Sequence, residues 1–267
     1  MKPVTISTLM AMKQAGEKIT SLTAYDYSFA AMLDKAGIEV IIVGDSLGMV
    51  LQGHENTLPV TLEDVIYHSR CVARGCKRAW IVADMPFMTY QVNPEQALIN
   101  AGQAMQRGRA HMVKLEGGSA IIDTVRFLTE HGVPVCGHLG LTPQAVHQLG
   151  GYKIQGRDAT SAERLREDAH ALQEAGARLL ILEAIPTALA KRVSEELTIP
   201  TVGIGAGPEC DGQVLVLHDI LGIYPRPSPK FSKNFMEGST GIEEAIEAFI
   251  TAVRSGAFPG PEHSFEN

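Results

Sequence analysis

Residues 40–46, Val40-Ile41-Ile42-Val43-Gly44-Asp45-Ser46, form an unbroken apolar run that ends in glycine and two polar residues. A strand of this composition is buried on both faces, as strands of parallel sheets are. Seven other segments show a comparable pattern, and each ends in a polar or glycine-rich cluster: Ile19–Asp26, Trp80–Phe87, Met112–Gly118, Val133–Leu141, Leu179–Pro186, Pro200–Gly207 and Gln213–Asp219. The sequence therefore predicts a largely parallel sheet built from eight strands.

The segments between these runs have helical periodicity and recognisable caps. Thr61 with Asp64 predicts a capping box, and Asn93-Pro94 predicts an N-cap followed by proline in the first turn. Alternating strands and helices over about 250 residues predict a (β/α)₈ TIM-type barrel. We expect one domain over residues 1–267, with a short N-terminal helix and a C-terminal helix plus tail.

Two features leave alternatives to this barrel. A doubly wound open sheet is the rival fold, but its G-x-G-x-x-G fingerprint after the first strand is absent. The interval from Gly207 to Gln213 is too short for a full helix, and Gln213–Asp219 could be either strand or helix.

Composition excludes several classes of protein. The 267 residues carry 23 basic and 30 acidic side chains, a formal net charge of −7, with no cluster of bases that would bind nucleic acid. No run of eighteen apolar residues could cross a membrane, and the N-terminus lacks the apolar core of a signal peptide. Four cysteines without zinc-site spacing favour reduced thiols and a cytoplasmic location.

Ionisable residues stand where several predicted strands end. Asp45, Asp84 and Glu116 follow apolar runs directly, and Lys114 is two residues before Glu116. In TIM barrels the carboxyl ends of the strands form the active site. Three carboxylates meeting there would repel one another, so we expect a divalent cation, and oxygen ligands favour Mg²⁺. A ring of salt bridges is the structural alternative.

Other candidate residues are less decisive. Glu183 ends the sixth run among apolar neighbours and is a candidate general base, or a helix cap. His138 could be a buried structural histidine. The glycines of residues 203–207 could bind an anion or allow a tight turn, and residues 150–153 and 224–230 are expected loops, the second a candidate lid.

The same residues belong to a set of motifs that resembles the ketopantoate hydroxymethyltransferase family. The likeness extends from about Thr5 to Phe265. It is carried by Val43-Gly44-Asp45-Ser46-Leu47-Gly48-Met49, Leu58-Pro59-Val60-Thr61, Val113-Lys114-Leu115-Glu116-Gly117-Gly118, Gly137-His138-Leu139-Gly140-Leu141-Thr142-Pro143-Gln144, Gly203–Gly207, Asp211-Gly212-Gln213 and Pro229-Lys230-Phe231.

The resemblance implies a TIM-type barrel related to phosphoenolpyruvate- and pyruvate-using enzymes, assembled as a homodecamer (a pentamer of dimers). It implies one Mg²⁺ per subunit, held by Asp45 and Asp84, with Glu116 as a further carboxylate of the metal site, directly or through water. Asp45, Ser46, Asp84 and Lys114 are then expected to contact the 2-oxo acid, and Glu183 to be the catalytic base.

The implied reaction is transfer of a hydroxymethyl group from 5,10-methylenetetrahydrofolate to 3-methyl-2-oxobutanoate, giving 2-dehydropantoate and tetrahydrofolate. This is the first step of the pantoate branch of pantothenate biosynthesis. The alternative is a Mg²⁺-dependent C–C lyase or mutase of the same superfamily. Its lyase branch carries a Lys-Cys-Gly-His loop, which Val135-Cys136-Gly137-His138 echoes with valine in place of lysine. A non-enzymatic binding or scaffold barrel is a third hypothesis.

Overall fold

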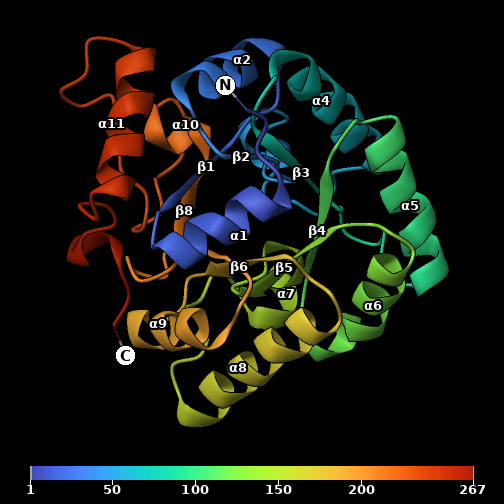
Figure 1. The fold of residues 1–267 in the computed structure, drawn as a ribbon. Helices are drawn as coiled ribbons and strands as arrows, with labels where there is room; N and C mark the ends of the chain where they lie inside the picture. The colour runs from blue at the N-terminus through green and yellow to red at the C-terminus, as the bar shows by residue number, and fades with distance from the viewer. Residues whose placement is uncertain (1, 267) are drawn as a thin grey trace.

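The computed structural model describes residues 2–266 and contains a closed barrel of eight parallel strands in the order β1 to β8. This confirms the predicted (β/α)₈ architecture, which Figure 1 shows as a ring of strands inside a ring of helices. The strands are β1 (Ile19–Thr23), β2 (Val40–Val43), β3 (Trp80–Asp84), β4 (Met112–Glu116), β5 (Val135–Gly140), β6 (Leu179–Glu183), β7 (Thr201–Ile204) and β8 (Gly212–Leu215).

The helices cover the outside of this barrel. The longer ones are α2 (Tyr27–Ala36), α4 (Leu62–Gly75), α5 (Pro94–Gln106), α6 (Ile122–Glu130), α8 (Ala159–Glu174), α9 (Thr187–Glu196) and α11 (Ile242–Arg254). Helix α1 (Ile6–Ala15) is as long as α2, and the short helices are α3 (Leu47–Val50), α7 (Val146–Leu149), α10 (Leu217–Ile220), η1 (Ser119–Ile121), η2 (Pro143–Ala145) and η3 (Pro261–His263). Within residues 2–266, no helix is both long and apolar enough to cross a membrane.

The capping signals in the sequence place the helix starts correctly. Thr61 and Asp64 form a reciprocal capping box at the start of α4, and the Asn93 side chain accepts a hydrogen bond from the Gln96 backbone before Pro94 opens α5. Each of these side chains satisfies backbone N–H groups that a helix start leaves free.

The last strand resolves the ambiguity over residues 213–219. Strand β8 ends at Leu215 and helix α10 begins at Leu217, so the segment contains both elements. No helix separates β7 from β8; the connecting turn is instead held by a hydrogen bond from Gln213 Nε2 to the Gly207 carbonyl at 3.0 Å.

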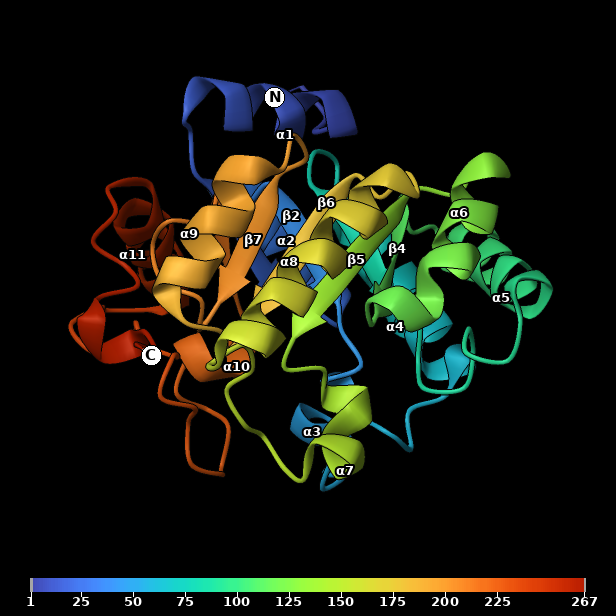
Figure 2. The same ribbon diagram turned by 90° about the horizontal axis from the view of Figure 1, so that it is seen from below.

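The two ends of the barrel are differently built. Figure 2 shows α1 across one end and the short helices α3 and α7 at the opposite end. The strands run from the α1 end toward α3 and α7 because α3 follows β2 and α7 follows β5. The polar residues that end the strands therefore gather at the α3 and α7 end, which we call the mouth.

Candidate active site

Four of the predicted site residues meet at the mouth. Asp84 and Lys114 are register partners on β3 and β4, and Lys114 Nζ lies 3.0 Å from Asp84 Oδ1. The same ammonium lies 3.5 Å from Glu116 Oε1, two residues further along β4. Asp45 joins the group because its backbone N–H donates to Asp84 Oδ2 at 3.0 Å. All four side chains are buried.

Burial and crowding change the protonation of this group. Burial raises the pKa of Asp45 to about 8, and the charges of Asp84 and Glu116 add to the effect. Burial would lower the pKa of Lys114, but the surrounding carboxylates outweigh it and raise that pKa well above its usual value. Burial likewise opposes ionisation of Glu116, yet Lys114 and His138 hold its pKa below the ordinary value. The Lys114 ammonium thus lies among three carboxyl groups. The raised pKa of Asp45 favours the protonated form of that carboxyl group near neutral pH.

Ser46 lies beside this cluster, as the first residue before α3. Its Oγ is 2.8 Å from the hydroxyl oxygen of Tyr25, a residue that sequence reasoning did not select. Burial raises the pKa of Tyr25 far above its ordinary value, so the phenol remains protonated. Ser46 and Tyr25 therefore present neutral hydroxyl groups next to the acidic cluster.

Glu183 ends β6 and connects to the cluster through His138. His138 Nε2 lies 3.2 Å from Glu183 Oε2, and His138 Nδ1 lies 3.3 Å from Glu116 Oε1. Burial and the Lys114 charge act to lower the pKa of His138. The interactions with Glu116 and Glu183 outweigh them, and the net effect raises this pKa to about 9. The buried His138 ring therefore lies between two carboxylates, with Lys114 Nζ 3.3 Å from its Nδ1, so the structure places it among the site residues, whereas the sequence indicated a structural histidine.

Sequence reasoning also missed Gln144, which organises the site from the loop after β5. Its Nε2 donates to Asp45 Oδ2 and to the Met85 carbonyl, both at 2.9 Å, and its backbone N–H donates to Glu116 Oε2 at 3.0 Å. The Tyr90 hydroxyl donates to Gln144 Oε1 at 2.8 Å. The only signal in the sequence was the position of Gln144 at the end of the Gly137–Gln144 motif.

The residues present fit a Mg²⁺ ion that completes its coordination with substrate and water. Among residues 2–266, no three His, Cys, Asp or Glu side chains are arranged as a ready-made metal site. Mg²⁺, however, is usually bound by only one or two carboxylates, with waters and substrate oxygens as its other ligands. Asp84 Oδ1 and Glu116 Oε1 are buried and are approached by the nitrogens of Lys114 and His138 at 3.0 to 3.5 Å, so these two oxygens retain acceptor capacity for a cation. A divalent ion would also supply positive charge that Lys114 alone does not.

The glycines of residues 203–207 are accounted for by packing. Gly205 and Gly207 have φ of +63° and +77°. A Cβ at Gly205 would lie 2.8 Å from the Phe231 ring, and one at Gly207 would lie 2.5 Å from Thr187. The positive φ values and the close approach of neighbouring side chains explain why glycine occupies these positions.

Both loops noted in the sequence contact the segment that follows Asp45. The Tyr152 hydroxyl is 3.8 Å from Met49 Sδ, and Arg226 donates to the Gly53 carbonyl at 3.2 Å. Residues 150–153 and 224–230 therefore border the mouth.

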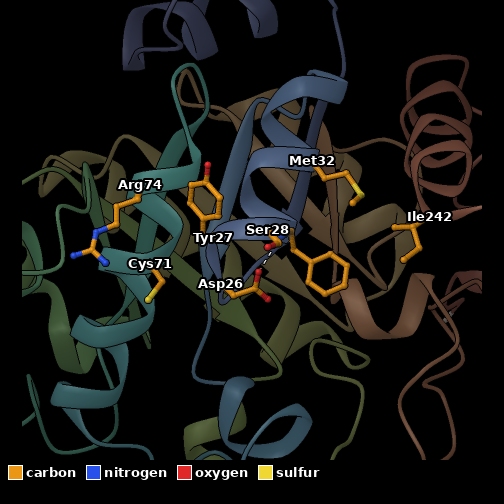
Figure 3. Close-up of a pocket in the computed structure, with 8 residues that line it drawn as sticks. Asp26, Tyr27, Ser28, Met32, Cys71, Arg74 and Ile242 are labelled. Carbon is orange, nitrogen blue, oxygen red and sulfur yellow. Dashed lines mark hydrogen bonds between the residues drawn. The ribbon is translucent and has the colours of Figure 1, made fainter.

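Two cavities are large enough for a small molecule. One, of about 640 Å³, lies on the outer surface between α2, α4 and the start of α11 (Figure 3). Its single acid, Asp26, caps α2 through the Phe29 N–H at 2.9 Å, which leaves no pair of groups suited to catalysis. The other, of about 630 Å³, includes Glu116 and Gln144 and opens from the mouth toward α8.

Comparison with known proteins agrees with this geometry. Residues 3–261 match the family described as "Ketopantoate hydroxymethyltransferase". The chain is 58% identical to the "3-methyl-2-oxobutanoate hydroxymethyltransferase" of Janthinobacterium sp. (strain Marseille), over 99% of this chain and 96% of that protein. It is also 58% identical to the protein of the same name from Shewanella loihica (strain ATCC BAA-1088 / PV-4), over 99% of this chain and all of the relative.

Solved structures with low sequence identity share the fold. Phosphonopyruvate hydrolase superposes with a TM-score of 0.62 at 14% identity, covering 82% of this chain and 83% of that one. A 2,3-dimethylmalate lyase, described as a member of the PEP mutase/isocitrate lyase superfamily, gives 0.57 at 17% identity, covering 79% and 80%. These likenesses show that the chain shares the barrel fold of these proteins.

Proposed function

This chain belongs to the ketopantoate hydroxymethyltransferase family, and from that premise we propose how its mouth works. The reaction is transfer of a hydroxymethyl group from 5,10-methylenetetrahydrofolate to 3-methyl-2-oxobutanoate, which yields 2-dehydropantoate and tetrahydrofolate. This is the first step of the pantoate branch of pantothenate biosynthesis. The observation that carries the proposal is the buried group of Asp45, Asp84, Lys114 and Glu116, joined to Glu183 through His138.

Asp45 and Asp84 would hold one Mg²⁺ per subunit, with Glu116 at the edge of its shell, directly or through water. When bound, the ion withdraws electron density from the ketone and stabilises negative charge on the substrate oxygens. A solved structure of phosphonopyruvate hydrolase contains oxalate and Mg²⁺, so a related barrel binds this combination of ligands. The Ser46 hydroxyl and the Lys114 ammonium contribute a hydrogen bond and positive charge to the bound oxo acid.

Glu183 would remove the proton from C3 of the oxo acid. Its Oε2 is engaged by His138 at 3.2 Å, which leaves Oε1 to accept the proton. His138 does not need to touch substrate for this role. It is a positioning residue that ties the base on β6 to Glu116 on β4. The resulting carbon nucleophile then bonds to the one-carbon unit of the folate. The carbon–nitrogen bonds to the folate break to release tetrahydrofolate, and one water molecule supplies the oxygen of the new hydroxymethyl group.

Deuterium exchange tests this mechanism without the folate. In D₂O, the C3 proton signal of 3-methyl-2-oxobutanoate should disappear from the NMR spectrum only when enzyme and Mg²⁺ are both present. Glu183→Gln should slow the exchange by roughly 10²- to 10⁴-fold, the range for loss of a general base. Exchange that persists in this variant would remove Glu183 as the base, and exchange without Mg²⁺ would remove the metal.

The structure disfavours the lyase alternative. Cys136 lies inside strand β5 rather than on a loop, and its side chain is fully buried. Burial raises the pKa of the Cys136 thiol to about 12, so a nucleophilic thiolate is not available there. The buried ionisable groups at the mouth also disfavour a scaffold without activity. Burying such groups lowers the stability of the fold, so a cluster of them at strand ends indicates a functional site.

The proposal extends to the cellular setting of the enzyme. Its partners would be the 2-oxo acid and the folate, with neither nucleic acid nor membrane. We place it in the cytoplasm, where reduced folates are available, and as a homo-oligomer, a decamer as in the family it belongs to. Size-exclusion chromatography with light scattering measures the assembly directly.

A further inference from the structure

The cavity that opens from the mouth toward α8 has a size and lining beyond what the oxo acid needs. Its volume is about 630 Å³, within the range of roughly 300–1,000 Å³ that accommodates drug-sized ligands. A five-carbon oxo acid would occupy a small part of it. The cavity wall includes Glu116 at the end of β4 and Gly140 at the end of β5, and Gly140 is the register partner of Glu183. One end of the cavity therefore meets the place where the carbon nucleophile would form.

Two charged side chains on α8 face this cavity. Arg164 and Asp168 lie one helical turn apart, and neither forms an ion pair with another residue between positions 2 and 266. Asp168 Oδ1 accepts a hydrogen bond from the Ser119 backbone at 2.8 Å, which fixes the carboxylate and leaves Oδ2 without a partner. Two opposite charges are thus presented to the cavity by a rigid helix.

Glycine at position 118 allows the Asp168 carboxylate to lie directly against the backbone that follows β4. A Cβ built at Gly118 would collide with the Asp168 carboxylate, and Gly117 has a φ of +125° that L residues rarely adopt. Apolar side chains complete this part of the wall, namely Ile121, Leu139, Leu149 and Leu165. A flat heterocycle would pack on these side chains with a polar edge against Asp168.

We infer that this cavity binds the folate co-substrate, with Asp168 receiving the pterin ring and Arg164 the carboxylates of the glutamate tail. The inference rests on the proposed function. A pterin presents an amino group and a ring N–H side by side, which match the two oxygens of a carboxylate. The exposed guanidinium of Arg164, one turn toward the start of α8, is placed for the tail as it leaves the cavity. The one-carbon unit between ring and tail then lies on the side of Glu116 and Gly140.

Binding of two probes separates the roles of the two side chains. Tetrahydrofolate carries ring and glutamate, whereas tetrahydropteroate carries the ring without glutamate. Asp168→Asn, which keeps an acceptor for the Ser119 N–H, should weaken binding of both probes by on the order of ten- to a hundredfold. Arg164→Gln should weaken tetrahydrofolate by roughly two- to fivefold and leave tetrahydropteroate as in the wild type. Isothermal titration calorimetry under anaerobic conditions measures all four affinities.

Matched controls and the deuterium exchange assay make the outcomes distinguishable. Glu167→Gln on α8 and Arg126→Gln on α6 change exposed charges outside the cavity wall and should bind both probes like the wild type. If wild-type enzyme with Mg²⁺ does not exchange the C3 proton, the proposed function fails, whatever the folate results. If exchange occurs but Asp168→Asn and Arg164→Gln bind both probes normally, the folate site is elsewhere. Should Asp168→Asn not fold, Arg164→Gln still tests the site. It should weaken binding of tetrahydrofolate, which carries the glutamate tail, and leave binding of tetrahydropteroate unchanged.

Discussion

At the scale of single residues, Gln144 links two carboxyl groups of the site, those of Asp45 and Glu116. Its side-chain Nε2 donates to Asp45 and its backbone N–H donates to Glu116. The Tyr90 hydroxyl donates to Gln144 Oε1 and so holds the amide in place. Gln144→Met keeps the side-chain length but removes the donor to Asp45. Outer-shell partners of this kind typically contribute 10- to 100-fold to metal affinity. We expect the apparent Kd for Mg²⁺, measured from the rate of C3 exchange against metal concentration, to rise by about that factor.

The exposed Gln106 on α5 offers a matched control. Gln106→Met makes the same chemical change away from the mouth and should leave the Mg²⁺ dependence as in the wild type. An unchanged Kd in Gln144→Met, with the protein folded by circular dichroism, would show that Asp45 needs no such support.

Asp219 gives a prediction about stability and pH. Burial raises its pKa from 3.8 to about 6, and no side-chain hydrogen bond offsets this. Below pH 3.8 the carboxyl is protonated in both folded and unfolded chains. As the pH rises from 3.8 to 6, the unfolded chain loses its proton before the folded chain does, so the folded state becomes relatively less stable. The difference corresponds to at most about 3 kcal/mol above pH 6.

Asp219→Asn should therefore be neutral at pH ~3, well below both pKa values, and stabilising by up to about 3 kcal/mol at pH 7. Urea unfolding at a series of pH values measures the change in free energy. Asp123→Asn, an exposed change on α6, serves as the control. A constant effect of Asp219→Asn across this pH range would contradict the assignment.

The convergence of three carboxyl groups could be predicted from the sequence because their position follows from one rule. Asp45, Asp84 and Glu116 end apolar runs, so any parallel barrel brings them to one mouth. His138 and Gln144 could not be predicted in the same way. Their contacts depend on the register of β5 against β4 and β6 and on the path of the following loop, neither of which leaves a local signal.

At the scale of elements, one side chain ties α2 to the strand that carries Asp84. The Asp34 carboxylate, on α2, accepts hydrogen bonds from the backbone N–H groups of Lys77, Arg78 and Ala79, at 2.7 to 3.0 Å, just before β3. Asp34→Ala leaves these donors without partners and should lower the free energy of unfolding by about 3 kcal/mol. Asp34→Asn retains one acceptor oxygen and should lose less.

Urea unfolding compares the two variants, with Asp123→Ala as an exposed control. A loss below about 1 kcal/mol in Asp34→Ala would mean that water replaces the carboxylate at this connection.

The elements themselves were largely predictable, since apolar runs and caps are local signals. The eighth unit was predictable only in part. The sequence indicated that the interval before Gln213 is too short for a full helix, which is confirmed, but it left residues 213–219 as either strand or helix, and both β8 and α10 lie within residues 212–220. The role of α8 as a cavity wall was also hidden. Its inward stripe of Leu165, Ala169 and Leu172 predicts burial, but Arg164 and Asp168 face the cavity only because of how α8 packs.

At the scale of the whole molecule, the two ends of the barrel differ in how their acidic side chains are paired with cations. At the amino ends of the strands, Glu39 pairs with Arg78 and Arg254, and Asp211 pairs with Lys13. Each acid there has a cation or several donors of its own. At the mouth, the three carboxyl groups of Asp84, Glu116 and Glu183 share Lys114 and His138. The negative charges at the amino end are thus balanced by cations and donors of the chain itself. An added cation would reduce the repulsion among the carboxyl groups at the mouth.

This asymmetry predicts where ligands change the dynamics of the chain. Mg²⁺ with 3-methyl-2-oxobutanoate should slow amide hydrogen exchange in residues 44–51, 85–91, 117–121 and 140–150, which follow the strand ends of the mouth. Residues 34–39, 76–80 and 209–212 at the amino end should exchange as before, because local opening there does not break ligand contacts. Glu183→Gln, which alters the base but keeps the metal carboxylates, should show the same protection as the wild type. Equal protection at both ends would mean that the ligands stabilise the barrel globally, and protection confined to the amino end would place the site at the wrong end of the barrel.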